Sequence, residues 1–206
     1  MKKLVVILIS VTLFWGVNLY GQEQDYIELA KLTVEEFTCS VTDLNANYYG
    51  LSSPDLLKTV RPGDPVIHYA VGLNSLKEYT ADMDPEKIIT EMGYVTVPLV
   101  NPETGKVETF VMLSRIEGNY RPAGMGQAPY SMNFMILTKR AELPKDARLI
   151  RIPALNMAYI GMSMNDTLKL IPILNKDQME FIPEPASLIF DELGRQVKDL
   201  KEDVPH

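Results

Sequence analysis

The chain has 206 residues, 46% of them hydrophobic and 23% charged, with a formal net charge of −7. These values are ordinary for a globular protein and exclude a disordered chain. The acidic balance argues against nucleic acids and anionic membranes as partners, because both are bound through lysine and arginine. The single cysteine excludes a disulfide framework and a multi-cysteine zinc site.

Residues 1–21 have the features of a secretory signal peptide. Two lysines precede the largely apolar run 4–17, which is too short to span a membrane as a helix of roughly 20 apolar residues. We expect cleavage after Gly21, with an uncleaved anchor as the alternative. Cleavage removes Trp15, the only tryptophan, and both lysines, so the net charge falls from −7 to −9. It predicts a secreted or periplasmic protein of a Gram-negative envelope, without a stable membrane span.

The first elements of the mature chain are a helix and a strand. Residues 25–44 have apolar positions in steps of three and four, which predicts an amphipathic helix. These positions are Ile27, Ala30, Val34, Phe37, Val41 and Leu44. Cys39 neighbours this face, so we expect an inert buried thiol. Residues 66–73 are rich in β-forming residues and predict a strand. Asp84 is a candidate N-cap for a short helix over 85–92.

Strands separated by short turns follow. Residues 94–100, 107–115 and 120–121 predict an antiparallel meander, because turns containing Asn, Pro and Gly separate them. A helix is predicted over 128–141. Further strands are predicted over 149–152, 157–160 and 168–174. A last amphipathic helix has one apolar face formed by Ile189, Leu193, Val197 and Leu200.

The order of these elements predicts the fold class. Strands cluster without long crossovers, which favours an α+β domain over residues 22–206, with a mostly antiparallel sheet and helices packed on one face. Residues 66–74 and 149–156 both end a β-rich run in Leu-Asn. One interpretation is a duplication into two α–β halves, about 25–125 and 126–206, whose seam would be a natural ligand site. The alternative is that two strand-turn units share a generic β composition.

Four segments resemble a pattern found in secreted bacterial α+β proteins of unassigned activity. The segments are 61–66, 97–100, 117–126 and 149–156, and the resemblance spans roughly residues 60 to 175. The layout of a duplicated α–β unit is also similar to that of the Tic22 family of translocation proteins. Neither resemblance implies an activity or carries over site residues.

Catalytic motifs are absent from the sequence. It has no Gly-x-Ser-x-Gly, Ser-x-x-Lys, His-Glu-x-x-His or P-loop. The chain has two histidines, His68 and the terminal His206, too few for a common zinc site without carboxylates. We expect no metal and no cofactor. A Cys39–His68 thiol dyad is conceivable, but the simpler interpretation places His68 at a solvent-facing or core-edge position of its strand.

Six residues are candidates for ligand binding. The Gly-x-Gly at 124–126, before a predicted helix and near Arg121, could form an anion-binding nest. The other candidates are His68 with its neighbour Tyr69, and Arg115 as an anion clamp. The full set is His68, Tyr69, Arg115, Arg121, Gly124 and Gly126.

Two functional hypotheses follow. The first is an exported, non-catalytic domain that binds a protein, peptide or small-molecule ligand, favoured because no catalytic constellation is visible. The second is a hydrolase-like enzyme that uses His68 with a nearby arginine or acidic residue. A concave pocket that places His68 beside a charged partner would favour the enzyme, and a flat exposed face would exclude it.

Overall fold

The structure is a computed structural model that describes residues 21–174 and 180–198. The expected signal peptide therefore lies outside the described residues, apart from Gly21 at the start of the first helix. Within the described ranges, no helix has both the length and the apolar character needed to cross a bilayer.

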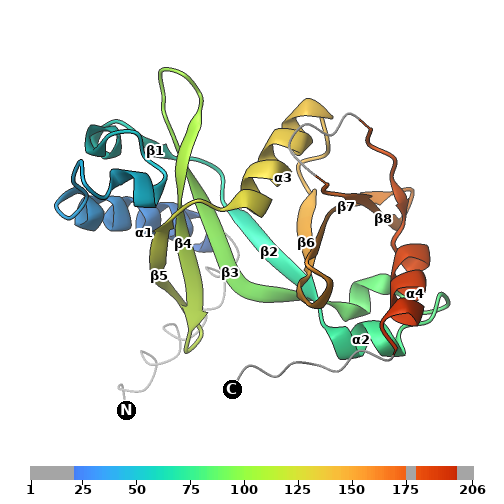
Figure 1. Ribbon diagram of the computed structural model, residues 1–206. Coiled ribbons are helices and arrows are strands. Elements are labelled where there is room, and N and C mark those ends of the chain that lie inside the picture. Colours follow the sequence, from blue (N-terminus) through green and yellow to red (C-terminus); the bar gives the residue numbers. More distant parts are fainter. Residues whose placement is uncertain (1–20, 175–179, 199–206) are drawn as a thin grey trace, which may run out of the picture.

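The described residues form one nine-stranded sheet in the order β5-β4-β3-β2-β6-β7-β8-β9, with β1 paired beside β3 (Figure 1). All pairings in it are antiparallel except that of β2 with β6. The strands are β1 (Arg61–Pro62), β2 (Val66–Val71), β3 (Ile89–Val100), β4 (Val107–Ile116), β5 (Asn119–Gly126), β6 (Arg148–Ile152), β7 (Met157–Met164), β8 (Thr167–Pro172) and β9 (Glu184–Pro185). The predicted α+β class with a mostly antiparallel sheet is confirmed.

Four α-helices pack on this sheet in the described part of the chain. They are α1 (Gly21–Thr38), α2 (Leu73–Glu78), α3 (Pro129–Arg140) and α4 (Ala186–Gln196). Figure 1 shows α1 against the β3–β5 half of the sheet, and α2 and α4 beside the β6–β8 half. The helices have no strong intrinsic preference to form alone at these lengths, so their burial against the sheet stabilises them.

Strand alternation divides the helices between the two faces of the sheet. The buried hydrophobic residues form three clusters, one against α1, one against α2 and α4, and one against α3. In β6, Leu149 belongs to the cluster against α3, whereas its neighbour Ile150 belongs to the cluster against α2 and α4. In β2, Ile67 contacts the cluster of α1 and Val71 that of α2 and α4. Because side chains two apart on a strand share a face, α1, α2 and α4 cover one face and α3 covers the other. In the described residues, none of these clusters packs a helix against the face of β3–β5 that lies opposite α1.

The N-terminal helix is shorter than predicted. It ends at Thr38, and Leu44 is 99% exposed, so the apolar spacing beyond residue 38 does not continue as a helix. Of the α1 positions whose burial is described, residues 26–38, Tyr26, Ala30 and Thr33 are buried. The prediction of a buried thiol is wrong, because Cys39 follows the last helical residue and is exposed.

Two predicted boundaries around β2 and β3 are also wrong. The predicted helix over 85–92 is only a 3-10 turn, Pro85–Ile88, with Asp84 as its N-cap, and β3 begins at Ile89. The predicted strand over 66–73 ends at Val71, and Leu73 begins α2, a helix absent from the prediction. The helix predicted over 128–141 is confirmed as α3.

The centre of the sheet is where the two predicted halves meet. One strand of each half, β2 and β6, lie side by side and parallel, with His68 opposite Leu149 and Ala70 opposite Arg151. The duplication itself stays a prediction. The boundary between the two predicted halves nevertheless corresponds to one strand pair in the structure, the β2–β6 ladder.

Candidate functional site

A cavity of about 150 Å³ lies over the central strands, on the face that carries α3. Side chains of β2, β3 and β6 contribute to its wall, and the segment that leads into α3 completes it. Its lining residues are His68, Tyr94, Gln127, Ala128, Pro129, Tyr130, Ser131 and Arg151. The site therefore draws on both sides of the central β2–β6 ladder.

His68 belongs to a buried polar cluster in this wall. Its Nε2 lies 3.0 Å from Ser131 Oγ and 3.2 Å from Thr96 Oγ1, and the Thr96 hydroxyl donates to Ser131 Oγ over 2.8 Å. His68 is 2% exposed, and the other two side chains are fully buried. The expectation of a solvent-facing or core-edge histidine is wrong.

A distortion of β3 accommodates His68. Ile67 pairs with Val95 and Tyr69 with Glu91, so two extra residues of β3 lie opposite the single residue His68. Gly93, with a φ of 62°, lies in this bulge. Bulges re-aim side chains beside functional sites, and here Tyr94 is turned so that its ring meets the His68 ring edge-to-face at 4.8 Å.

The hydrogen bonds of the cluster leave one nitrogen of His68 without a partner. Since Thr96 donates to Ser131, the Ser131 hydroxyl can donate to Nε2, which places the imidazole proton on Nδ1. This buried Nδ1 has no hydrogen-bond partner in the described part of the chain. Burial and the nearby Arg151 lower the pKa of His68 from 6.5 to about 4, so the ring is neutral at pH 7.

Arg151 supplies the positive charge of the site. Its guanidinium stacks on the ring of Tyr130 at 4.4 Å, and the Tyr130 hydroxyl donates to Asn156 Oδ1. Asn156 thereby holds the ring on which the guanidinium rests. The buried Nε of Arg151 has no hydrogen-bond partner, and Arg151 has no ion pair among the described residues. Arg151 Nε is thus the second buried nitrogen of this site without a partner, after His68 Nδ1. A buried donor without an acceptor costs free energy of folding.

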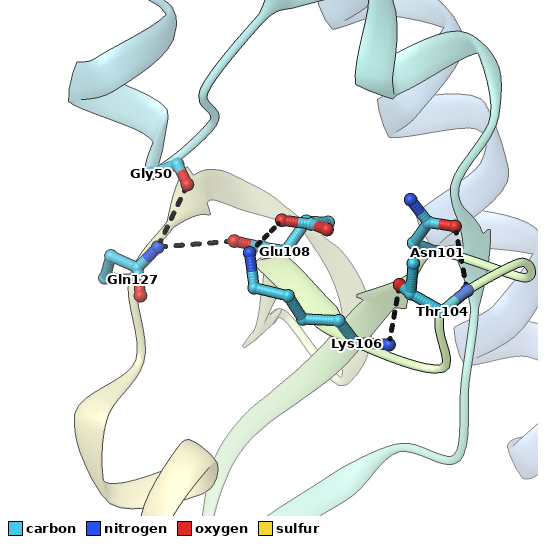
Figure 2. Close-up of polar contacts among 6 residues, drawn as sticks. All are labelled: Gly50, Asn101, Thr104, Lys106, Glu108 and Gln127. Carbon is cyan, nitrogen blue, oxygen red and sulfur yellow. Dashed lines mark hydrogen bonds and ion pairs between the residues drawn. The ribbon is translucent and has the colours of Figure 1, made fainter.

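Gln127 ties the segment before α3 to the rest of the fold. Its Nε2 donates to the backbone carbonyls of Gly50 and Glu108, each over 3.4 Å (Figure 2). The Glu108 carboxylate, almost buried, pairs with Lys106 over 2.8 Å. Figure 2 shows the Gln127 side chain reaching between the two carbonyls. The segment that forms one wall of the cavity is thus anchored to β4 and to the loop at Gly50.

Of the six sequence candidates, only His68 lines this cavity. Tyr69 points to the other face and lines a separate cavity of about 340 Å³, where Arg148 stacks on it at 5.6 Å. Arg115 pairs with Glu91 over 2.6 Å and stacks on Tyr120, away from His68. Arg121 lies 4.0 Å from Glu117 at the surface.

The predicted glycine nest is wrong. Gly124 and Gly126 belong to β5, where they pair with Met112 and Phe110 of β4, and α3 begins only at Pro129. Their backbone groups therefore take part in a strand pair and do not converge on an anion ahead of a helix.

Sequence reasoning missed Thr96, Ser131 and Arg151. One signal for Arg151 is visible in the sequence, since it is the charged residue between Ile150 and Ile152 in an apolar strand. Nothing comparable marks Thr96 or Ser131, because their proximity to His68 depends on the folded sheet.

Comparisons with known proteins add no assignment: no protein-family model, curated protein or solved structure matches the chain. In the ranges that the structure describes, no three His, Cys, Asp or Glu side chains gather as a metal site would require. The resemblances stated from the sequence stay predictions.

Proposed function

We propose that this protein is an exported binding domain whose central cavity holds an anionic, hydrogen-bond-accepting group of a small ligand. The observation that carries the proposal is a pair of buried nitrogens, His68 Nδ1 and Arg151 Nε, which have no hydrogen-bond partner among the described residues and belong to two side chains that line one cavity. Buried polar groups are almost always paired, so an acceptor from a ligand is the simplest partner for both.

The charge of the site supports the same assignment. Arg151 is a cation without an acidic partner in the described part of the chain, and a charge-assisted hydrogen bond is stronger than a neutral one. Export is proposed from residues 1–21 alone. The histidine lies in a concave pocket beside a basic residue, the arrangement that the enzyme hypothesis also requires, so catalysis needs its own test.

Replacing Arg151 with methionine should weaken the binding of small anions at least tenfold, because it removes the positive charge and a donor while keeping an apolar stem. The measurement is proton NMR of the histidine rings during titration with acetate, benzoate and inorganic phosphate. The chain has only two histidines, and His68→Gln identifies the signal of His68.

Arg121→Met is the matched control, since Arg121 is exposed and outside the cavity. We expect it to bind like the wild type. The proposal is overturned if no anion in the panel shifts the His68 signal, or if Arg151→Met binds as tightly as the wild type.

A second candidate function rests on one distance, the 3.0 Å between Ser131 Oγ and His68 Nε2. A serine beside a histidine can act as a nucleophile with its base. Here, however, Ser131 is fully buried and the lowered pKa makes His68 a weak base at neutral pH. No carboxylate orients Nδ1 within the described residues.

We expect a fluorophosphonate probe to leave Ser131 unlabelled in the wild-type protein. Peptide mass spectrometry measures the labelling, with Ser131→Ala as the negative control. Stoichiometric labelling at Ser131 would favour the hydrolase over the binding domain.

A further inference from the structure

An apolar strip adjoins the cavity on the sheet face opposite α1. We define the strip as Tyr94 of β3, Met112 of β4, and Gly124 and Gly126 of β5. Tyr94, Met112 and Gly124 are half-buried, and Gly126 is buried. None of the four belongs to the three buried hydrophobic clusters of the described chain. This part of the sheet therefore has an apolar surface over which no helix packs in those clusters.

The strip begins at the cavity wall. Tyr94 lines the cavity and also packs against His68. Met112 is the cross-strand partner of Thr96, whose hydroxyl oxygen lies 3.2 Å from His68 Nε2. Directly opposed residues on adjacent strands lie roughly 5 Å apart at their Cβ atoms. Tyr94 is therefore the residue through which a ligand in the cavity would reach the strip, and Met112 lies diagonally from Tyr94 on the adjacent strand β4.

The two glycines lie beside the end of Met112. A Cβ added to Gly124 or Gly126 would lie 3.5 or 3.8 Å from Met112 Cε, which is ordinary van der Waals contact, so the methionine does not occupy either position. Methionine is flexible and polarizable and adapts to apolar shapes. The strip is thus shallow over β5 and has a movable side chain beside it.

The cavity selects the charged end of the ligand. Two of its lining residues, His68 and Arg151, each have an unpaired buried nitrogen, and Arg151 is also a cation. A carboxylate has one negative charge and two acceptor oxygens, so it satisfies both donors and neutralises the charge. A phosphate dianion would leave one negative charge buried without a partner, which is costly. The volume of about 150 Å³ suits a carboxylate with a short stem.

We propose that the ligand is a small aliphatic carboxylic acid, with its carboxylate between His68 and Arg151 and its hydrocarbon chain along the strip. This inference rests on the proposed function, and it adds the chemical class of the ligand. The strip accounts for the apolar part and the cavity for the charged part. We favour a free small acid as the ligand, because the cavity fits one charged group and the strip fits one hydrocarbon chain.

The test is isothermal titration with acetate, butyrate, hexanoate and octanoate, accompanied by hexanol, hexylamine and inorganic phosphate. We expect affinity to rise by up to about fourfold for each methylene that reaches the strip. Hexanol, hexylamine and phosphate should bind at least tenfold more weakly than hexanoate.

Met112→Gln supplies the specific variant, since it keeps the length of the side chain and makes the strip polar. It should weaken the binding of hexanoate and octanoate more than that of acetate, so the gain with chain length becomes smaller. Met164→Gln is the matched control: Met164 is 40% exposed on β7 and outside the strip. Gly126→Val is a second variant, which fills the shallow part of the strip and should weaken octanoate more than acetate.

The outcomes separate this inference from the proposed function. If acetate binds but longer acids gain nothing, the cavity proposal stands and the strip has no role. If phosphate binds as well as hexanoate, the carboxylate assignment is overturned. If an acetylated dipeptide ending in leucine binds more tightly than every free acid, the ligand is a peptide terminus. If no anion binds, the proposed function itself fails.

Discussion

Replacing Gly194 with alanine should destabilise the protein by about 2–3 kcal/mol, the upper part of the range of about 1–3 kcal/mol for forcing atoms into a packed core. Gly194 lies in α4 and is buried. A Cβ at this position would lie 2.4 Å from the backbone carbonyl oxygen of Leu76 in α2. A backbone oxygen cannot rotate away as a side chain can, so the two helices must separate. In an exposed helix the same change would stabilise by up to about 1 kcal/mol, so the expected sign is reversed here.

Gly161→Ala serves as the comparison for Gly194→Ala. Its added Cβ would meet the Cδ1 atom of Ile150 at 2.4 Å, and this atom is the end of a side chain that can change rotamer. We expect a loss of about 1 kcal/mol for this variant. Urea unfolding at pH 7 measures both. A Gly194→Ala protein as stable as the wild type would show that α2 and α4 are not held in close contact.

The stability of the protein should fall as the pH drops from about 6.5 to 4, and His68 should cause about 3 kcal/mol of this fall. Its pKa is about 4 in the folded state and 6.5 as the ordinary value. Between these values the unfolded chain binds a proton that the folded protein does not, so the free energy of unfolding decreases as pH falls. Each unit of difference corresponds to about 1.4 kcal/mol. Above pH 6.5 the contribution is constant.

His68→Gln removes the titrating group while keeping a side chain that can bond Ser131. Urea unfolding of both proteins at pH 7, 5.5 and 4 isolates the effect, because the acidic residues contribute equally to both. Arg151→Met should raise the pKa of His68, since Arg151 is one cause of its low value. A difference between the two proteins that does not vary with pH, or an NMR titration of His68 above pH 6, would contradict the prediction.

The fold was predictable where local pattern and tertiary packing agree. The spacing in residues 128–141 predicted α3, and the turns between strands predicted the meander. α2 was missed because it has only six residues and no side-chain N-cap bond. The start of β3 was missed because Gly93 resembles a helix stop, whereas it lies in a β-bulge.

The site was predictable only through His68. Ser131 is 63 residues from it in sequence, and no local pattern connects the two. Arg115 and Arg121 were also candidates from the sequence, but both lie outside the cavity in the folded sheet. The choice among the arginines depends on the pairing of β2 with β6, which joins two separate runs of the chain.

That pairing has a consequence for how binding relates to cooperativity. The parallel ladder between β2 and β6 has only three residue pairs, and its two strands contribute His68 and Arg151. A ligand that contacts both residues would bridge the one parallel strand pair of the described sheet. It would stabilise this pair more than either flanking set of strands, so hydrogen exchange at β2 and β6 would slow most when the site is filled.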